Sequence, residues 1–233
     1  SVKKASVYFK DSLKNCRICP RKCGVDRASG KTGYCRAGLK ASVYSYLAHH
    51  GEEPPISGTG GSGTIFFSRC NMKCVYCQNY RFSQLDEGKE VTIDELSNIM
   101  LTLEKRGCHN INLVSPTHYL PQILSALEDA LEKGLSIPIV YNTSGYELTE
   151  SIKALEGAVD IYLPDMRYSD NAMAKKYSGA PDYVERNRGA ILEMYKQVGD
   201  LTVDKSGLAK KGIIIRLLAL PENVSGTIET LRF

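Results

Sequence analysis

The sequence has no apolar stretch approaching the roughly 18 residues that a transmembrane helix needs, which argues against a membrane protein. Residues 1–10 carry lysines, but they have neither an apolar core nor a small-residue cleavage site, so they do not form a secretory signal. Internal repeats and low-complexity tracts are also absent. We therefore expect a cytoplasmic protein.

The composition excludes a disordered chain. Hydrophobic residues make up 42% and charged residues 24% of the 233 residues, close to the average of globular proteins. This length fits one large α/β domain, or one domain plus a small appendage, and allows a sizeable core.

The eight cysteines are the most informative residue type. In the reducing cytoplasm their spacing is better interpreted as metal ligation than as disulfides. Cys16, Cys19, Cys23 and Cys35 supply four thiols, enough for a zinc site or an auxiliary iron–sulfur cluster, and the spacing does not choose between them. We predict a Cys-rich, metal-binding extension over residues 1–50.

The same segment is strongly basic. Residues 14–40 hold eight lysines and arginines against the single acid Asp26. This charge can offset metal-bound thiolates or attract an acidic partner.

Residues 51–63 contain two prolines and five glycines, which predicts an ordered loop without regular structure. The histidines and acids just before and within it (His49, His50, Glu52 and Glu53) lack the spacing of a metal motif, so a solvated loop is favoured. The glycine run precedes a strand and lacks the Lys-Ser/Thr of a phosphate-binding loop.

Strand and helix patterns alternate after this loop. Apolar runs predict strands at residues 64–67, 111–114, 138–141, 160–163 and 212–220, and helical spacing predicts helices at 92–106, 121–133, 147–155 and 182–198. The alternation predicts a parallel sheet over residues 51–233, with a site at the carboxyl ends of its strands. A helix begins at Thr227 but the sequence stops at Phe233, so we expect the domain to lack its natural carboxyl end.

The strongest chemical signal is the triplet Cys70, Cys74 and Cys77, which directly follows the first predicted barrel strand. Zinc prefers four ligands, whereas a [4Fe–4S] cube held by three cysteines leaves one iron open for another ligand. Buried or zinc-bound structural cysteines are the alternative, but three clustered free thiols are hard to keep unoxidised.

The spacing CxxxCxΦC, with Tyr76 in the aromatic position, resembles the signature of radical S-adenosylmethionine (SAM) enzymes. The segments GSGTIFFSRCNMKCVYCQNY, NINLVSPTHY, PIVYNTSGYE, DIYLPDMRY and GIIIRLLALP are similar to the pyruvate formate-lyase activating enzyme-like group. The resemblance implies an incomplete (β/α)6 radical SAM barrel with a [4Fe–4S] cluster on Cys70, Cys74 and Cys77. It further implies reductive cleavage of SAM to a 5′-deoxyadenosyl radical, a low-potential electron donor such as flavodoxin or ferredoxin, and a glycyl-radical-type partner protein.

The same resemblance implies several SAM-binding residues. They are the backbone at Tyr76 for adenine, Asn142 and Ser144 for the ribose or methionine group, and Asp165 with Arg167 for the SAM carboxylate. Thr117 and His118 stand where the activating enzymes carry Gly-Gly-Glu, and the family's carboxylate is missing there. Turn formation at Asn142 and Ser144, a core role for Tyr76, and a helix cap or a satisfied histidine at His118 are the alternatives.

Arg216 lies within the apolar run Ile-Ile-Ile-Arg-Leu-Leu, so its charge needs a ligand or a buried carboxylate beside it.

Two other functions stay open from the sequence. One is radical SAM modification of a small molecule or of RNA, with the basic amino-terminal segment contacting phosphates. The other is a non-catalytic iron–sulfur redox protein. The Asp-Gly-Pro-Gly stretch often found upstream in the activating enzymes is absent before Cys70.

Overall fold

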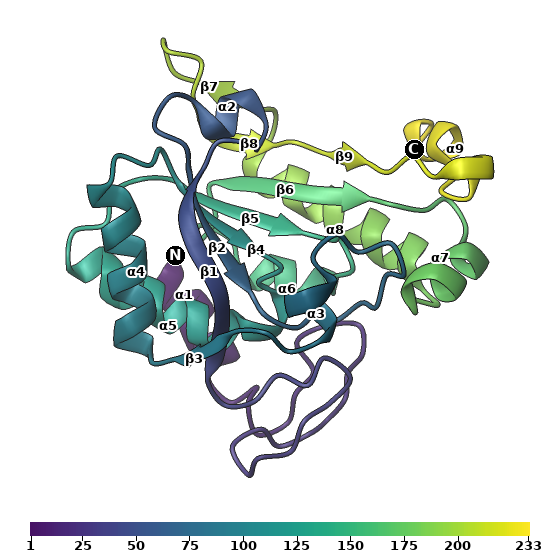
Figure 1. The fold of residues 1–233 in the computed structure, drawn as a ribbon, viewed down its shortest axis with the longest axis horizontal. Coiled ribbons are helices and arrows are strands. Elements are labelled where there is room, and N and C mark those ends of the chain that lie inside the picture. Colours follow the sequence, from purple (N-terminus) through teal and green to yellow (C-terminus); the bar gives the residue numbers. More distant parts are fainter.

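A computed structural model describes all 233 residues. Its core is a nine-stranded sheet in the order β3-β1-β2-β4-β5-β6-β8-β7, with β9 also pairing β6 (Figure 1). The strands are β1 (Ala41–His49), β2 (Ser62–Phe67), β3 (Lys89–Val91), β4 (Ile111–Val114), β5 (Ile139–Thr143), β6 (Ile161–Met166), β7 (Thr202–Val203), β8 (Ala209–Ile213) and β9 (Arg216–Leu217). From β2 through β4, β5 and β6 to β8 all pairings are parallel, and the sheet does not close. This confirms the predicted α/β fold with an incomplete barrel.

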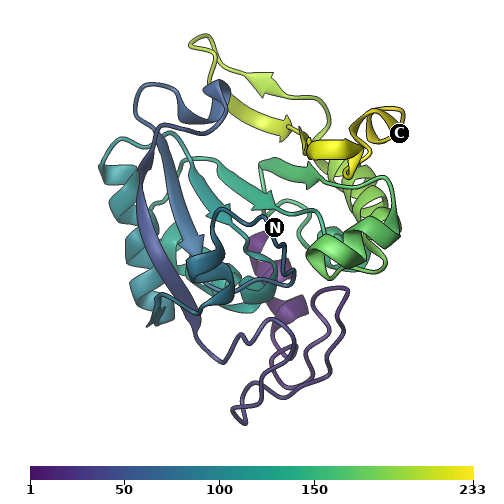
Figure 2. The same ribbon diagram turned by 45° about the vertical axis from the view of Figure 1, so that its right-hand side comes forward.

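Nine α-helices accompany the sheet. They are α1 (Val2–Phe9), α2 (Pro54–Ser57), α3 (Tyr80–Gln84), α4 (Ile93–Lys105), α5 (Leu120–Glu132), α6 (Thr149–Ala154), α7 (Asn171–Ser178), α8 (Tyr183–Val198) and α9 (Thr227–Leu231). Helices α4, α5, α1, α6 and α8 contact one another in that order along the sheet (Figures 1 and 2). None of the helices is long and apolar enough to cross a bilayer.

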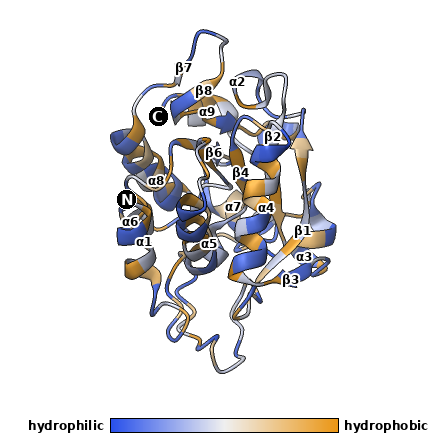
Figure 3. Cartoon of the chain, turned by 90° about the vertical axis from the view of Figure 1, so that its left-hand side faces the viewer, coloured by the Kyte–Doolittle hydropathy of each residue, from blue (hydrophilic) through white to orange (hydrophobic).

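Helix α4 shows how local sequence sets an element. The Thr92 hydroxyl accepts from the Glu95 amide at 3.1 Å, and the Glu95 carboxylate accepts from the Thr92 amide at 2.7 Å. This reciprocal cap satisfies two amides that the first helical turn leaves unpaired. Leu96, Met100 and Leu103 form the buried side of the helix, opposite its hydrophilic side (Figure 3).

Strand alternation sorts side chains between two faces. In β2 and β4, Ile65, Phe67, Ile111 and Leu113 join the core beneath α4 and α5. Phe66, one residue out of phase, faces the opposite, concave side, where its ring lies 5.8 Å from that of Phe82 in helix α3 (Tyr80–Gln84). At the carboxyl ends of the strands, side chains that point to the same side of the sheet as Phe66 therefore face the concave side.

The predicted loop 51–63 contains regular structure after all. Pro54 and Pro55 occupy the first turn of α2, where the missing amide hydrogens cost nothing, and β2 begins at Ser62. Ile56 of α2 is fully buried with apolar residues of β5, β6 and β8, so this short helix closes the amino end of the barrel.

The predicted strand 212–220 is interrupted. Residues 214–215 leave the sheet, and Ile215 and Leu217 are 42% and 39% exposed. Two short strands replace the predicted one, and both pair with β6. Strand β8 pairs with the start of β6, and β9 pairs with Asp165 and Met166 at the end of β6. The apolar residues of segment 212–220 therefore form part of one wall of the open barrel, and the segment is not a fully buried strand.

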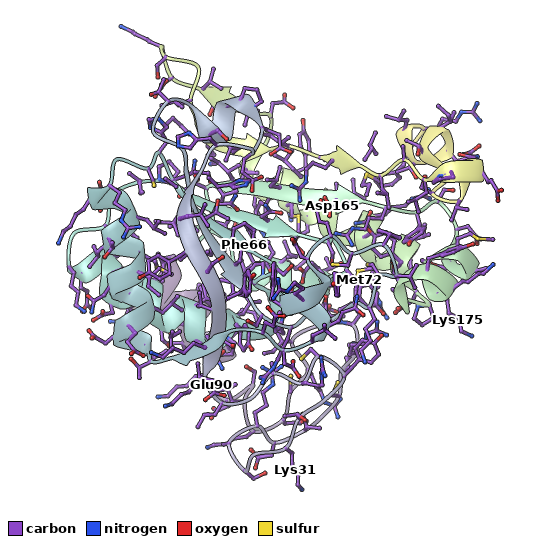
Figure 4. All side chains as sticks on the ribbon, viewed as in Figure 1. Lys31, Phe66, Met72, Glu90, Asp165 and Lys175 are labelled. Atoms are coloured by element: carbon purple, nitrogen blue, oxygen red, sulfur yellow. The ribbon has the colours of Figure 1, made fainter.

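Residues 10–40 contain neither helix nor strand and project below the sheet, with Lys31 at the tip (Figures 1 and 4). The elements on either side of this segment belong to the domain, because α1 packs on α5 and β1 pairs with β2. The amino-terminal 50 residues are therefore partly integrated with the sheet.

Candidate functional site

A cavity of about 520 Å³ lies at the carboxyl ends of the parallel strands. The concave-face residues Phe66, Val114, Asn142 and Asp165, from four neighbouring strands, line it. Figure 4 labels Phe66 on β2 and Asp165 on β6, which mark its two sides. This volume lies in the range of small-molecule and cofactor sites.

The cysteine triplet lies on the loop that follows β2, beside this cavity. Cys77 lines the cavity, together with Tyr76, Gln78 and Asn79. Hydrogen bonds to helix α7 fix this loop. The amides of Lys73 and Val75 donate to carbonyls at the end of α7 at 3.1 and 2.9 Å. The sequence therefore places three thiols on an anchored loop at the edge of the cavity.

Each of the three sulfurs has a polar neighbour. The Met72 amide donates to Cys70 Sγ at 3.4 Å, Cys77 Sγ lies 3.3 Å from the Ser83 hydroxyl, and Arg167 Nη1 donates to Cys74 Sγ at 3.1 Å. Donors directed at sulfur stabilise thiolates, the form in which cysteine binds metals.

This donor set fits a three-cysteine cluster in its chemistry. Each of the three thiols has a polar neighbour, and Cys77 lines a cavity with room for a further ligand. As the side chains stand, no group of three or more His, Cys, Asp or Glu residues is arranged to hold a metal ion. Cluster binding therefore requires the three thiols to turn toward a common point.

Asp165 joins two arginines in the cavity wall. Its Oδ2 accepts from Nε and Nη2 of Arg167 at 3.0 and 2.5 Å, and its Oδ1 accepts from Nε of Arg216 at 2.8 Å. Burial opposes the charge of Arg167, but Asp165 and Cys74 outweigh it and raise the pKa of Arg167 well above its usual value. Both arginines line the cavity, together with the Asp165 carboxylate between them.

Arg216 has the carboxylate partner that its apolar sequence context demanded. Besides Asp165, its guanidinium lies 3.7 Å from Glu52 and donates to Asn142 Oδ1 at 2.7 Å. Glu52 is only 9% exposed at its side chain and lines the cavity, so the expectation of a solvated loop was wrong for this residue. Burial raises the pKa of Glu52, and the charge of Arg216 partly counteracts this.

Other predicted residues also meet at the cavity. Asn142 and Ser144 line it at the end of β5. Ser115, which was not among the predicted site residues, also lines it, with a left-handed φ of 56° directly after β4. The hydroxyl of Tyr76 is 2.6 Å from that of Tyr168, and burial raises the pKa of Tyr76. The Tyr76 ring is thereby held against the cavity wall.

Thr117 and His118 do not line the cavity. The Thr117 hydroxyl donates to Glu147 at 2.6 Å, and His118 Nε2 lies 2.9 Å from the Ser68 carbonyl. Both are buried, and burial lowers the pKa of His118 to about 3, so its ring is neutral. Both side chains make hydrogen bonds within the buried interior, which argues against the prediction that they contact SAM.

Sequence reasoning missed several lining residues. His49 and Glu52 come from the segment before α2, and Gln78 and Asn79 directly follow the cysteine triplet. Proximity to Cys77 was a usable signal for the last two. No local pattern identified Glu52, because its partner Arg216 is near the other end of the sequence.

The four amino-terminal cysteines lie together outside this cavity. Cys16, Cys19, Cys23 and Cys35 line a separate cavity of about 10 Å³. All eight cysteines are unpaired. Cys108 is buried in the core beneath α4 and acts there as a small apolar residue.

Comparison with known proteins identifies the family. The model of the radical SAM superfamily matches residues 64–229, which include the cysteine triplet and every strand from β4 to β9. The chain belongs to the radical SAM superfamily. This membership implies an enzyme that uses a [4Fe–4S] cluster and SAM.

Two curated relatives come from Methanocaldococcus jannaschii. The uncharacterized protein MJ0674 is 34% identical over 186 residues, which are 76% of this chain and 52% of the relative. The uncharacterized protein MJ0808 is 25% identical over 173 residues, which are 66% of this chain and 50% of the relative. The chain thus spans about half the length of the curated relatives it matches.

Proposed function

We propose that this radical SAM protein binds its cluster on Cys70, Cys74 and Cys77, holds SAM in the 520 Å³ cavity, and abstracts hydrogen from a glycine of a partner protein. The observation that carries the first part is the position of Cys77 on the cavity wall, with N–H donors at the sulfurs of Cys70 and Cys74 and a hydroxyl beside that of Cys77. When bound, the reduced cluster supplies one electron that splits SAM into methionine and a 5′-deoxyadenosyl radical.

The residues of the chain bind and orient the ligand. Asn142 and Ser144 offer an amide and a hydroxyl toward ribose or methionine oxygens. Arg167 and Arg216, bridged by Asp165, place fixed positive charge toward the SAM carboxylate. Asp165 and Glu52 are the carboxylates available to the SAM amino group, since the family's Gly-Gly-Glu element is missing after β4.

The open barrel favours a macromolecular substrate. Val75 and Tyr80, which flank the lining residues of the cysteine loop, are 74% and 52% exposed, and the lining residue Leu217 is 39% exposed. Exposed apolar side chains at the mouth of a cavity suit contact with a partner loop. The similarity to activating enzymes favours a glycine in that loop as the residue from which the hydrogen atom is abstracted.

The basic amino-terminal segment gives less support to RNA as the substrate. Arg27 is buried, and Arg36 pairs with Asp86 at 3.0 Å, so two of the eight basic residues of this segment are unavailable to phosphates. We therefore favour the protein substrate.

Two assays separate the parts of this proposal. The anaerobically reconstituted chain, reduced with dithionite, is expected to convert SAM to 5′-deoxyadenosine, and Cys74→Ala is expected to form none, with Cys108→Ser as the matched control. A glycyl-radical EPR doublet on a candidate glycyl-radical enzyme after incubation supports the glycine substrate. 5′-Deoxyadenosine formation without that signal across candidates would reject the substrate but keep the SAM cleavage.

A further inference from the structure

The four amino-terminal cysteines come together in a segment with little other structure. Cys16, Cys19 and Cys35 are 4%, 5% and 6% exposed although no helix or strand carries them. Backbone hydrogen bonds from Cys16 to Val25 and from Gly24 to Cys16, at 3.0 and 2.8 Å, fold the segment back on itself. Gly33 is packed so closely that an added Cβ would lie 2.7 Å from Cys23 Sγ.

Two arginines point to negative charge on these sulfurs. Arg27 is 2% exposed, and its Nη2 donates to Cys16 Sγ at 3.0 Å and approaches Cys35 Sγ at 3.8 Å. Its Nη1 donates to the His118 carbonyl, and it forms no ion pair with a carboxylate. A buried cation without a counterion costs several kcal/mol, so an anionic partner is expected within contact distance.

Arg21 faces the same cysteine cavity. Its Nε donates to the Asn71 carbonyl at 2.9 Å, and its guanidinium stacks 3.7 Å from the ring centre of Tyr34. Its Nη2 is buried without a hydrogen-bond partner, and no carboxylate pairs with it. Two guanidinium groups that lack carboxylate partners therefore line one four-cysteine cavity.

We propose that Cys16, Cys19, Cys23 and Cys35 bind one Zn²⁺ ion as a structural tetrathiolate site, whose negative charge Arg21 and Arg27 offset. Four thiolates around a divalent ion leave two negative charges, and the two guanidinium groups balance them. Four protons leave the thiols when the ion binds. Rotation of the cysteine side chains completes the tetrahedron, since the thiols are not yet arranged to hold a metal.

The size of the cavity favours a single ion over a second cluster. Its volume of about 10 Å³ is that of a single small sphere, whereas the cavity beside Cys77 measures about 520 Å³. A closed site of four thiolates is typical of structural zinc. The ion stabilises residues 10–40, whose few apolar side chains provide little core of their own.

Metal analysis of the full chain tests this site. Anaerobically purified protein from medium containing zinc and iron is expected to hold about one zinc per chain besides the cluster iron. The double variant Cys19→Ser/Cys35→Ser is expected to lose the zinc, and Cys108→Ser is expected to keep it. Zinc that survives the double variant, or iron and sulfide for a second cluster that the double variant removes, would overturn the proposal.

A second measurement avoids any folding defect of the double variant. The triple variant Cys70→Ala/Cys74→Ala/Cys77→Ala keeps the amino-terminal cysteines, and with cobalt in place of zinc it is expected to show the ligand-field bands of a tetrahedral thiolate site. Absence of those bands would contradict a tetrathiolate site.

The role of Arg27 has its own readout. Arg27→Gln is expected to weaken zinc binding about 10- to 100-fold in a chelator competition, because it removes a cation that donates to a ligating sulfur. Arg17→Gln, on an exposed residue of the same segment, is expected to leave it unchanged. Equal zinc affinities of the two variants would refute the charge balance.

Discussion

Nη1 of Arg167 lies 3.1 Å from Sγ of Cys74, while Nε and Nη2 of the same guanidinium donate to Asp165. One cation thus contacts a proposed cluster ligand and the carboxylate that also accepts from Arg216. The cluster loop after β2 and the end of β6 are electrostatically connected through this side chain.

Arg167→Gln is expected to lower the reduction potential of the cluster. A cation that donates to a ligating sulfur favours the reduced, more negative cluster, so its loss favours the oxidised form. A tenfold change in that equilibrium corresponds to about 60 mV for one electron, and we expect a shift of this order. An EPR-monitored redox titration measures it, with the exposed Arg81→Gln as control. Identical midpoints for Arg167→Gln and the native chain would exclude this role.

Arg216→Gln is expected to weaken SAM binding about tenfold, which corresponds to about 1.4 kcal/mol. The substitution leaves Asp165 and Glu52 without this cation, so the cavity becomes more negative toward the SAM carboxylate. Equilibrium dialysis with labelled SAM measures the affinity, and cluster iron should stay constant. Arg232→Gln, on an exposed residue, is the control. Native affinity in Arg216→Gln would remove Arg216 from the SAM site.

Glu147→Gln is expected to stabilise the protein above neutral pH. Glu147 is fully buried, and burial raises its pKa to about 7 despite hydrogen bonds from Thr117, Thr143 and Tyr141. Because the folded pKa lies above the unfolded value, the contribution of Glu147 to stability is complete below about pH 4.5 and is lost as the pH rises through about 7.

The gain in free energy of unfolding at pH 8 is about 3 kcal/mol, and it should vanish near pH 4. Urea unfolding of both proteins between pH 4 and 8 measures the difference. Titration of His118 in the unfolded chain contributes equally to both proteins and cancels. A difference independent of pH would show that Glu147 ionises normally.

Thr92→Ala is expected to destabilise the protein by about 1 kcal/mol, the usual cost of an N-cap. For a domain of this size the melting temperature falls by about 2–4 °C. Thr102→Ala, near the carboxyl end of α4, is the control because the Thr102 hydroxyl donates only to the Asn98 carbonyl one turn back. Equal melting temperatures for Thr92→Ala and the native chain would mean that the cap adds nothing in the native fold.

The sequence predicted best those elements and residues whose position in the fold follows from the local pattern of apolar and polar residues. The strand at 111–114 has the predicted bounds because three of its four residues, Ile111, Leu113 and Val114, are apolar and the run is bounded by polar and turn-forming residues. The barrel rule located polar residues at strand ends, and Asn142, Ser144, Asp165, Arg167 and Arg216 do meet around one cavity. Their roles toward SAM stay predictions.

Features that depend on long-range pairing could not be predicted. Strand β1 has an irregular burial pattern because it pairs antiparallel at the side of the sheet, with Tyr44 and Tyr46 exposed. Glu52 reads as a loop residue until Arg216 is placed beside it. His118 has the strand-end position of a ligand contact, but its side chain turns to the Ser68 carbonyl, and sequence gives no rotamer.

The most direct test is electron–nuclear double resonance on the reduced cluster with SAM that carries ¹⁵N in its amino group. If three cysteines hold the cluster and SAM occupies the adjoining cavity, a ¹⁵N coupling to the cluster will appear, and Cys74→Ala will lose the cluster signal. A native cluster signal without that coupling under saturating SAM would contradict this arrangement of cluster and ligand.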